Sequence, residues 1–234
     1  MTFVEIEENI VLNSAFFEKI NQVTLGFQVE AQESFNELNL VCSPDHLKSL
    51  MLFLKNHESC RFDTLIDVCA VDYLHYGRYD WETSSATEYG YCRGVENQAE
   101  PMVTLDTPRF AVIYHLLSTT LNQRCRVKVY LPESDLRIPT VIDIWNAANW
   151  FEREAYDLYG VLFEDHPDLR RLLTDYGFIG HPFRKDFPLS GRVEMRYDAT
   201  LKRVVYEPVN IEPRVLVPKV IREDNRYIGE KGER

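Results

Sequence analysis

The stretch that most constrains the fold of this 234-residue chain lies at positions 109–132. It contains two runs rich in branched and aromatic residues, "RFAVIYHLLS" and "CRVKVYLP", joined by the polar segment "TTLNQR". Such runs favour β-strands, and a short polar link between two of them is typical of an antiparallel hairpin. The chain must therefore contain a sheet, and the other elements have to pack around it.

The residues before this hairpin predict further strands and two helices. A short helix is expected over 14–23, and "GFQVEAQESFNELNLVCS" reads as two strands separated by a polar turn. Ser43-Pro44 is a typical helix start, and apolar residues then recur at helical spacing. The run "RFDTLIDVCAVDY" predicts a buried strand. Residues 75–108 show no sustained periodicity and are expected to form a long loop or insertion.

After the hairpin, the sequence predicts one more helix and then a change of character. Thr140 is expected to cap this helix, with Asp143 at the capping-box position and Gly160 as the stop. Beyond it the prolines are frequent and periodicity is weak, which indicates extended chain. The predicted fold class is α+β: a two-layer domain with a mixed sheet and packed helices over 1–163, followed by an extended docking segment and a long C-terminal arm over 164–234.

Charge and cysteine content exclude several classes of function. The formal net charge is −11, and the first hundred residues hold 17 acidic against 6 basic side chains, so binding to nucleic acid is not expected. The apolar runs are too short to cross a bilayer, and the acidic start does not resemble a secretory signal. The five cysteines include no Cys-x-x-Cys pair, so we expect reduced thiols and neither an iron–sulfur cluster nor structural zinc.

Two groups of residues could carry chemistry. Glu152, Glu154 and Asp157 at helical spacing could act as acid–base groups or metal ligands, but a charged helix face with local ion pairs is the simpler interpretation, since no His-Glu-x-x-His pattern is present. His166 and His181, each followed by proline and near several carboxylates, could form an open metal site. Neither histidine lies on a predicted regular element, which argues against such a site.

The segment "DYGFIGHPFRKDFP", residues 175–188, is instead typical of a protein interface. Its glycines permit special turns, its prolines keep it extended, and its aromatic and Arg-Lys residues suit contacts with another protein. If the segment is an extended strand, Phe183, Lys185 and Phe187 face one way and Arg184 and Asp186 the other. The predicted interface residues are Arg170, Arg171, His181, Phe183, Arg184, Lys185, Asp186 and Phe187.

The region around this segment resembles a known family. The stretch "EREAYDLYGVLFEDHPDLRRLLTDYGFIGHPFRKDFP", residues 152–188, is similar to the hallmark segment of the 30 kDa subunit family of respiratory complex I, the NADH:quinone oxidoreductase, whose bacterial members are its C subunits. The similarity extends back through the 110–132 hairpin and the 139–160 helix. Residues 75–108 are longer than is usual in that family.

The resemblance implies a non-catalytic peripheral-arm subunit of the proton-pumping enzyme, one that scaffolds its neighbours. The chain would hold no flavin, iron–sulfur cluster or metal of its own; FMN and the clusters would belong to partner subunits, and quinone to a neighbouring one. The implied partners are the 49 kDa-type quinone-site subunit and the cluster-bearing subunits. Membrane association would occur through the complex, at the cytoplasmic face of a bacterial inner membrane or on the mitochondrial matrix side.

Two alternatives stay open at this stage. A related membrane-bound hydrogenase or formate-oxidising complex could contain a similar subunit. A free-standing metal-dependent enzyme using His166 and His181 belongs to a different functional class, and metal analysis of the pure chain distinguishes it from a scaffolding subunit.

Overall fold

The computed structural model describes residues 27, 29–34, 37–74, 76, 108–188 and 190–210. These residues belong to two compact units. The first, here called the sheet domain, contains 27–74 and 108–188; the second contains 76 and 190–210. The helix predicted over 14–23, Cys92, nearly all of the 75–108 insertion and the end of the arm after 210 lie outside the described residues.

The sheet domain is built on a five-stranded mixed sheet with the order β1-β2-β5-β4-β3. Its strands are β1 (Glu30–Ser34), β2 (Glu37–Cys42), β3 (Thr64–Asp72), β4 (Phe110–Ser118) and β5 (Gln123–Leu131). The pair β2 and β5 is parallel, and the other neighbours are antiparallel. The predicted 109–132 hairpin is confirmed as β4 and β5, and the predicted α+β class with a mixed sheet is confirmed as well.

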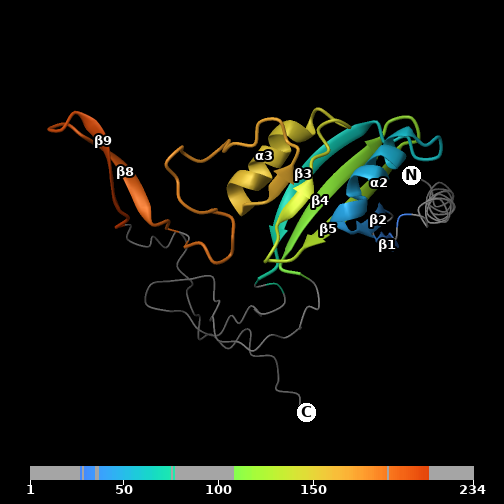
Figure 1. The fold of residues 1–234 in the computed structure, drawn as a ribbon, viewed down its shortest axis with the longest axis horizontal. Coiled ribbons are helices and arrows are strands. Elements are labelled where there is room, and N and C mark those ends of the chain that lie inside the picture. The colour runs from blue at the N-terminus through green and yellow to red at the C-terminus, as the bar shows by residue number, and fades with distance from the viewer. Residues whose placement is uncertain are drawn as a thin grey trace, which may run out of the picture. The chain divides into compact units, whose positions relative to one another are not determined.

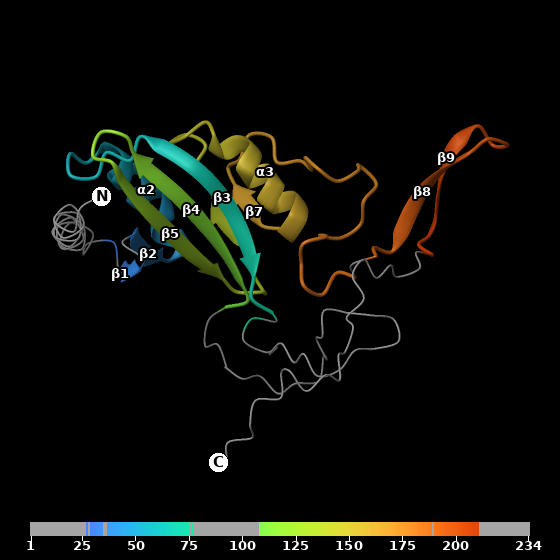
Figure 2. The ribbon, with the colours of Figure 1, turned by 180° about the vertical axis from the view of Figure 1, so that it is seen from behind.

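One face of this sheet forms the hydrophobic core. Buried side chains alternate along β2 and β5 with half-exposed ones, as expected for a sheet that is covered on one side only. Helix α2 (Pro44–Asn56) contributes Leu47, Leu50, Met51 and Leu54 to the same core cluster, and helix α3 (Ala148–Tyr159) contributes Ala148 and Ala155. Figure 1 shows α2 and α3 with the sheet, and in Figure 2 strands β3, β4 and β5 lie in front of α2.

Helix α2 begins where the sequence predicted, but α3 does not. Pro44 occupies the first turn of α2, although the Ser43 side chain makes no capping hydrogen bond. The predicted start of the later helix at Thr140 is wrong, because residues 141–147 form turns and α3 begins at Ala148. The Thr140 hydroxyl bonds to the Glu152 carboxylate, so a tertiary contact replaces the expected cap. The predicted stop at Gly160 is confirmed, with the left-handed backbone of a C-cap (φ +80°).

Two short strands, β6 (Arg137–Pro139) and β7 (Leu162–Glu164), pair in parallel on either side of α3 in the sequence. Residues 164–188, predicted to form one extended region with the C-terminal arm, cluster with the sheet domain in the structure. In the second unit, β8 (Val193–Asp198) and β9 (Arg203–Pro208) form an antiparallel ribbon. The sequence predicted extended chain there but missed this pairing. None of the helices in the described ranges has the length and apolar character that a bilayer crossing needs.

Candidate functional site

Residues 164–188, here called the docking segment, follow α3 and fold back onto its C-terminal end. The last carbonyl groups of a helix have no partner within the helix and must be satisfied from outside. Three of them at the end of α3 accept hydrogen bonds from the docking segment. The bonds run from His181 Nδ1 to the Asp157 carbonyl (2.9 Å), from the Phe183 N–H to the Leu158 carbonyl (3.1 Å) and from Arg184 Nε to the Tyr159 carbonyl (2.7 Å).

His181 is a structural donor in this arrangement. A carbonyl oxygen can only accept, so Nδ1 of His181 carries the proton. Burial lowers the pKa of His181, and the nearby charges of Arg184 and Arg171 lower it further, although the bond to the Asp157 carbonyl opposes this effect. The imidazole is therefore neutral at pH 7, and its other nitrogen points toward Gly160.

Gly160 permits this close approach. A Cβ atom at position 160 would lie 2.5 Å from Arg184 Nη2 and 2.6 Å from His181 Nε2, which is far inside van der Waals contact. Gly160 also has a left-handed backbone, which glycine adopts without strain. The residue that ends the helix thus leaves room for the side chains that complete it.

The Asp157 carboxylate holds the first half of the docking segment. Its side chain is fully buried, and it accepts hydrogen bonds from three consecutive backbone N–H groups at positions 172–174 (2.7–3.0 Å), from the Thr174 hydroxyl and from Arg171 Nη1 (2.9 Å). Burial alone would raise the pKa of Asp157, but the bonds from Thr174 and its neighbours hold that pKa well below the ordinary range. One carboxylate therefore fixes the path of a whole turn.

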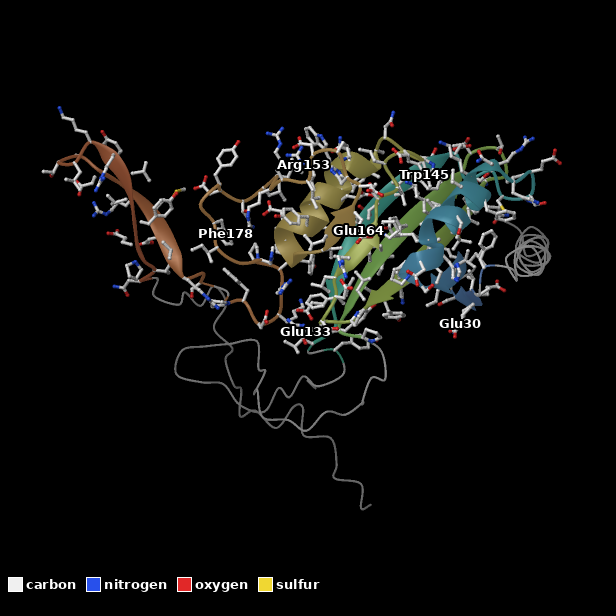
Figure 3. The ribbon with its side chains drawn as sticks, in the orientation of Figure 1. Glu30, Glu133, Trp145, Arg153, Glu164 and Phe178 are labelled. Atoms are coloured by element: carbon white, nitrogen blue, oxygen red, sulfur yellow. The ribbon has the colours of Figure 1, made fainter. Side chains whose placement is uncertain are left out.

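Two arginines complete this half of the segment. Arg171 also donates to the Gly180 carbonyl (3.0 Å) and lies over the ring of Phe178, which Figure 3 marks in this loop. Arg153, labelled on α3 in the same figure, donates to the carbonyls of Arg170 (3.2 Å) and Arg171 (3.4 Å). Both guanidinium groups are thus used to shape the backbone of the chain itself.

The second half of the segment is held at the end of β3. Arg109 binds the buried Asp72 side chain through two hydrogen bonds (2.9 and 2.8 Å) and also pairs with Glu133 (2.6 Å) and Asp186 (3.2 Å). The backbone N–H of Lys185 donates to the same Asp72 carboxylate (2.9 Å). Burial would raise the pKa of Asp72, but the bonds from Arg109 and Lys185 hold it below its usual range. Arg109 and Asp72 flank the 75–108 insertion in the sequence, so this cluster joins the residues on either side of the insertion to the docking segment.

A second buried carboxylate, Glu152, lies at the start of α3. It accepts hydrogen bonds from the Thr140 hydroxyl and from the Val141 N–H (2.8 Å), and its Oε2 lies 3.9 Å from Nε2 of the buried His166. Burial raises the pKa of Glu152 to about 7. The prediction that these residues form a charged helix face with local ion pairs is therefore wrong, because Glu152, Arg153 and Asp157 are all buried.

Glu152 makes the stability of the chain depend on pH. Because its pKa is higher in the folded chain (about 7) than its ordinary value of 4.5, the folded state binds the proton more tightly. The free energy of unfolding should therefore fall by up to about 3 kcal/mol as the pH rises from 4.5 to 7, relative to Glu152→Gln. Urea unfolding of both proteins across this range checks it. Above pH 7 and below pH 4.5 the two curves should run parallel; curves parallel throughout would contradict the raised pKa.

The histidines that the metal hypothesis required have other partners. His166 Nδ1 accepts a hydrogen bond from the Asp168 N–H (3.1 Å), and His181 binds the end of α3. Within the ranges that the structure describes, no three His, Cys, Asp or Glu side chains are grouped as metal ligands would be.

The predicted interface residues divide into exposed and half-buried groups. Arg170, Phe183, Lys185 and Asp186 are exposed, whereas Arg171, His181, Arg184 and Phe187 are half-buried. The expected alternation along an extended strand is absent, because the Arg184 N–H bonds to the His181 carbonyl and the Phe187 N–H to the Arg184 carbonyl, which makes consecutive turns.

Three exposed apolar side chains of the same segment were not among the predicted interface residues. Leu173, Tyr176 and Ile179 are 63%, 94% and 82% exposed, although the backbone around them is tightly held. Their signal in the sequence is the presence of large apolar residues among Gly, Asp and Thr, where a solvent-exposed turn would normally be polar.

Known proteins with similar sequences all point to one family. Residues 40–193 match the family model described as "Respiratory-chain NADH dehydrogenase, 30 Kd subunit". The chain is 58% identical over 222 residues to the C subunit of NADH-quinone oxidoreductase from Legionella pneumophila (strain Corby), covering 95% of this chain and 98% of that protein. It is 51% identical over 224 residues to the corresponding protein of Coxiella burnetii (strain Dugway 5J108-111), with 95% and 94% covered.

Among solved structures, a trypsin-resistant fragment of Nqo5 aligns with a TM-score of 0.47 and 30% identity, covering 66% of this chain and 99% of the fragment. The family assignment rests on the sequence matches, which cover more than half of the chain in one case and nearly all of it in the other. The chain therefore belongs to the 30 kDa subunit family of the respiratory-chain NADH dehydrogenase.

Proposed function

We propose that this chain is a non-catalytic peripheral-arm subunit of proton-pumping NADH:quinone oxidoreductase, and that it holds neighbouring subunits in register. One structural observation supports this role in addition to the family assignment. Three polar groups of the docking segment that could perform chemistry, Arg171, His181 and Arg184, are engaged in bonds that shape the chain itself. The segment also exposes four large apolar side chains, Leu173, Tyr176, Ile179 and Phe183, which suits contact with another protein.

The proposed partners are the 49 kDa-type quinone-site subunit and the cluster-bearing subunits of the same complex. FMN and the iron–sulfur clusters would be bound by those partners, and quinone would bind at a neighbouring subunit. Because the relatives are bacterial, the proposed location is the cytoplasmic face of the inner membrane, with attachment through the complex.

Within the docking segment, the structure supports a division of roles. Arg170, Phe183, Lys185 and Asp186 stay in the proposed interface, because their side chains are exposed. The other four predicted interface residues would act mainly by holding the exposed residues in position. These four are Arg171, His181, Arg184 and Phe187. Leu173, Tyr176 and Ile179 are added, since a rigid loop with exposed aromatic and aliphatic side chains loses little conformational entropy on binding.

The double variant Tyr176→Ser/Ile179→Ser tests this proposal. We expect about tenfold less assembled complex on a native gel, because two apolar contacts are lost. Both side chains are exposed, so the free energy of unfolding of the chain should change by less than about 0.5 kcal/mol. NADH:quinone activity per assembled complex should be unchanged.

A matched control is Leu121→Ser, an exposed apolar residue in the turn between β4 and β5, for which assembly should stay within twofold of wild type. Normal assembly of the double variant with lost activity per complex would contradict a docking role. That result would return His181 and its neighbours to the list of catalytic candidates.

A further inference from the structure

The β8–β9 ribbon has one wholly apolar face. Its register places Val193 opposite Pro208, Met195 opposite Tyr206, and Tyr197 opposite Val204. Alternate residues of a strand point to the same side of a sheet, so these six side chains share one face. Five of them are 53–62% exposed, and Pro208 is exposed too. Figure 1 shows the ribbon as two paired strands.

The opposite face of the ribbon is polar apart from Val205. It pairs Glu194 with Glu207, Arg196 with Val205, and Asp198 with Arg203, and an ion pair joins Arg196 to Glu207 (2.8 Å). A two-stranded ribbon alone is marginally stable in water, and a contiguous exposed apolar patch marks an interaction surface. We therefore expect another molecule to cover only the apolar side of the ribbon, with a flat surface that packs against this side.

The composition of the polar face favours a protein over a membrane as the covering surface. A segment that lies on a bilayer carries an excess of Lys and Arg opposite its apolar face. Here Glu194, Asp198 and Glu207 balance Arg196, Arg203 and the turn residue Lys202, so no such excess is present.

The same charges indicate what borders the contact. Lys202 and Arg203, at the turn, form no ion pair within the described part of the chain, so carboxylates on the partner would complement them at the rim. All of the ribbon except Val193 lies beyond the family-model match, which ends at residue 193. The alignment with the L. pneumophila protein covers 95% of the chain, however. The residues left unaligned are too few to contain the whole ribbon, so the alignment includes part of it at least.

We infer that the apolar face of the β8–β9 ribbon binds a neighbouring subunit of the oxidoreductase, on an apolar patch bordered by carboxylates. This inference rests on the proposed function, because it takes the partner from the same complex. It adds a second contact, made by the second unit of the chain, to that of the docking segment.

The matched pair Val204→Lys and Val205→Lys tests the inference within the complex. The two valines are adjacent and undergo the same chemical change, but only Val204 lies on the apolar face. With each variant expressed in place of the wild-type chain, we expect Val204→Lys to lower its recovery with the purified complex about tenfold. Val205→Lys should stay within twofold of wild type. Equal recovery of the two variants, whether high or low, would overturn the inference.

A photo-crosslinking amino acid provides a second measurement that does not depend on destabilising the ribbon. Placed at position 206, on the apolar face, it should crosslink to one other subunit of the complex; placed at 207, on the polar face, it should not. Crosslinks from 206 to a second copy of this chain would overturn the inference. So would binding of the wild-type chain to phosphatidylglycerol-containing vesicles that Val204→Lys abolishes.

Failure of the inference and failure of the proposed function give different results. If the wild-type chain does not purify with the other NADH:quinone oxidoreductase subunits, the proposed function fails. If it does, and Val204→Lys is recovered equally well, only the role of the ribbon face fails.

Discussion

Replacing Asp157 with alanine should destabilise the sheet domain by about 3–5 kcal/mol. The side chain is buried and accepts five hydrogen bonds, so its removal leaves the N–H groups of 172–174 without this acceptor and takes the carboxylate partner from the half-buried Arg171 guanidinium. Urea unfolding of the full chain measures the loss. Hydrogen exchange should show the amides of 172–174 opening before those of the sheet, because they depend on this carboxylate.

Asp168→Ala is the matched control. Asp168 pairs with Arg170 at 2.9 Å, but both side chains are more than half exposed, so this change should cost less than about 1 kcal/mol. A similar cost for the two variants would mean that the Asp157 bonds contribute no more than a surface ion pair.

The pKa of Asp157 adds a pH signature to the same comparison. It is held below the ordinary value of 3.8 in the folded chain, so its contribution to stability is present above pH 4 and is lost as the pH falls toward the lowered pKa. Asp157→Ala should therefore be less destabilising at pH 3 than at pH 7.

The sheet could be predicted from the sequence because its signals are local. Two β-like stretches around a polar turn indicated β1 and β2, and the polar link between two strand-like runs identified the β4–β5 hairpin. The start of α3 was missed because Thr140 bonds to Glu152, twelve residues later, instead of capping its own helix. A sequence window contains the candidate cap, but it does not show which acceptor the hydroxyl will find.

The docking segment was located from the sequence, but its conformation was not predicted. Its bonds join residues far apart, such as Lys185 to Asp72 and Arg184 to Tyr159, and no periodicity reports such contacts. A charged side chain in a proline-rich stretch can bind its own chain or another one. The sequence favoured binding to another chain for Arg184, and the structure shows that Arg184 binds at least its own chain.

These internal bonds bear on how the segment could work in a complex. Binding requires the ordering of loops and side chains, which lowers affinity. Here that ordering occurs when the chain itself folds, because Asp157 and Asp72 fix the two halves of the segment. The exposed Tyr176 and Ile179 are then presented on a backbone that is already held in place.

Replacing Gly160 with alanine should release the second half of the docking segment. A Cβ atom would lie 2.5 Å from Arg184 and 2.6 Å from His181, so both side chains must move away from the end of α3. Three helix carbonyls would lose donors, and alanine in a left-handed conformation adds about 1–2 kcal/mol of strain. We expect a total cost of about 3 kcal/mol in urea unfolding, with faster hydrogen exchange at positions 183–187.

Two further variants separate the clash from the backbone strain. Gly160→Asn should recover at most the strain part of this cost and stay well below wild-type stability, because asparagine tolerates the left-handed backbone but still carries a Cβ atom. Gly191→Ala has the same backbone sign (φ +78°) with no atom within 4 Å, and it should leave the unfolding of the sheet domain unchanged. If Gly160→Asn restored wild-type stability, strain alone would explain the effect. The packing of His181 and Arg184 against Gly160 would then contribute nothing to holding the docking segment.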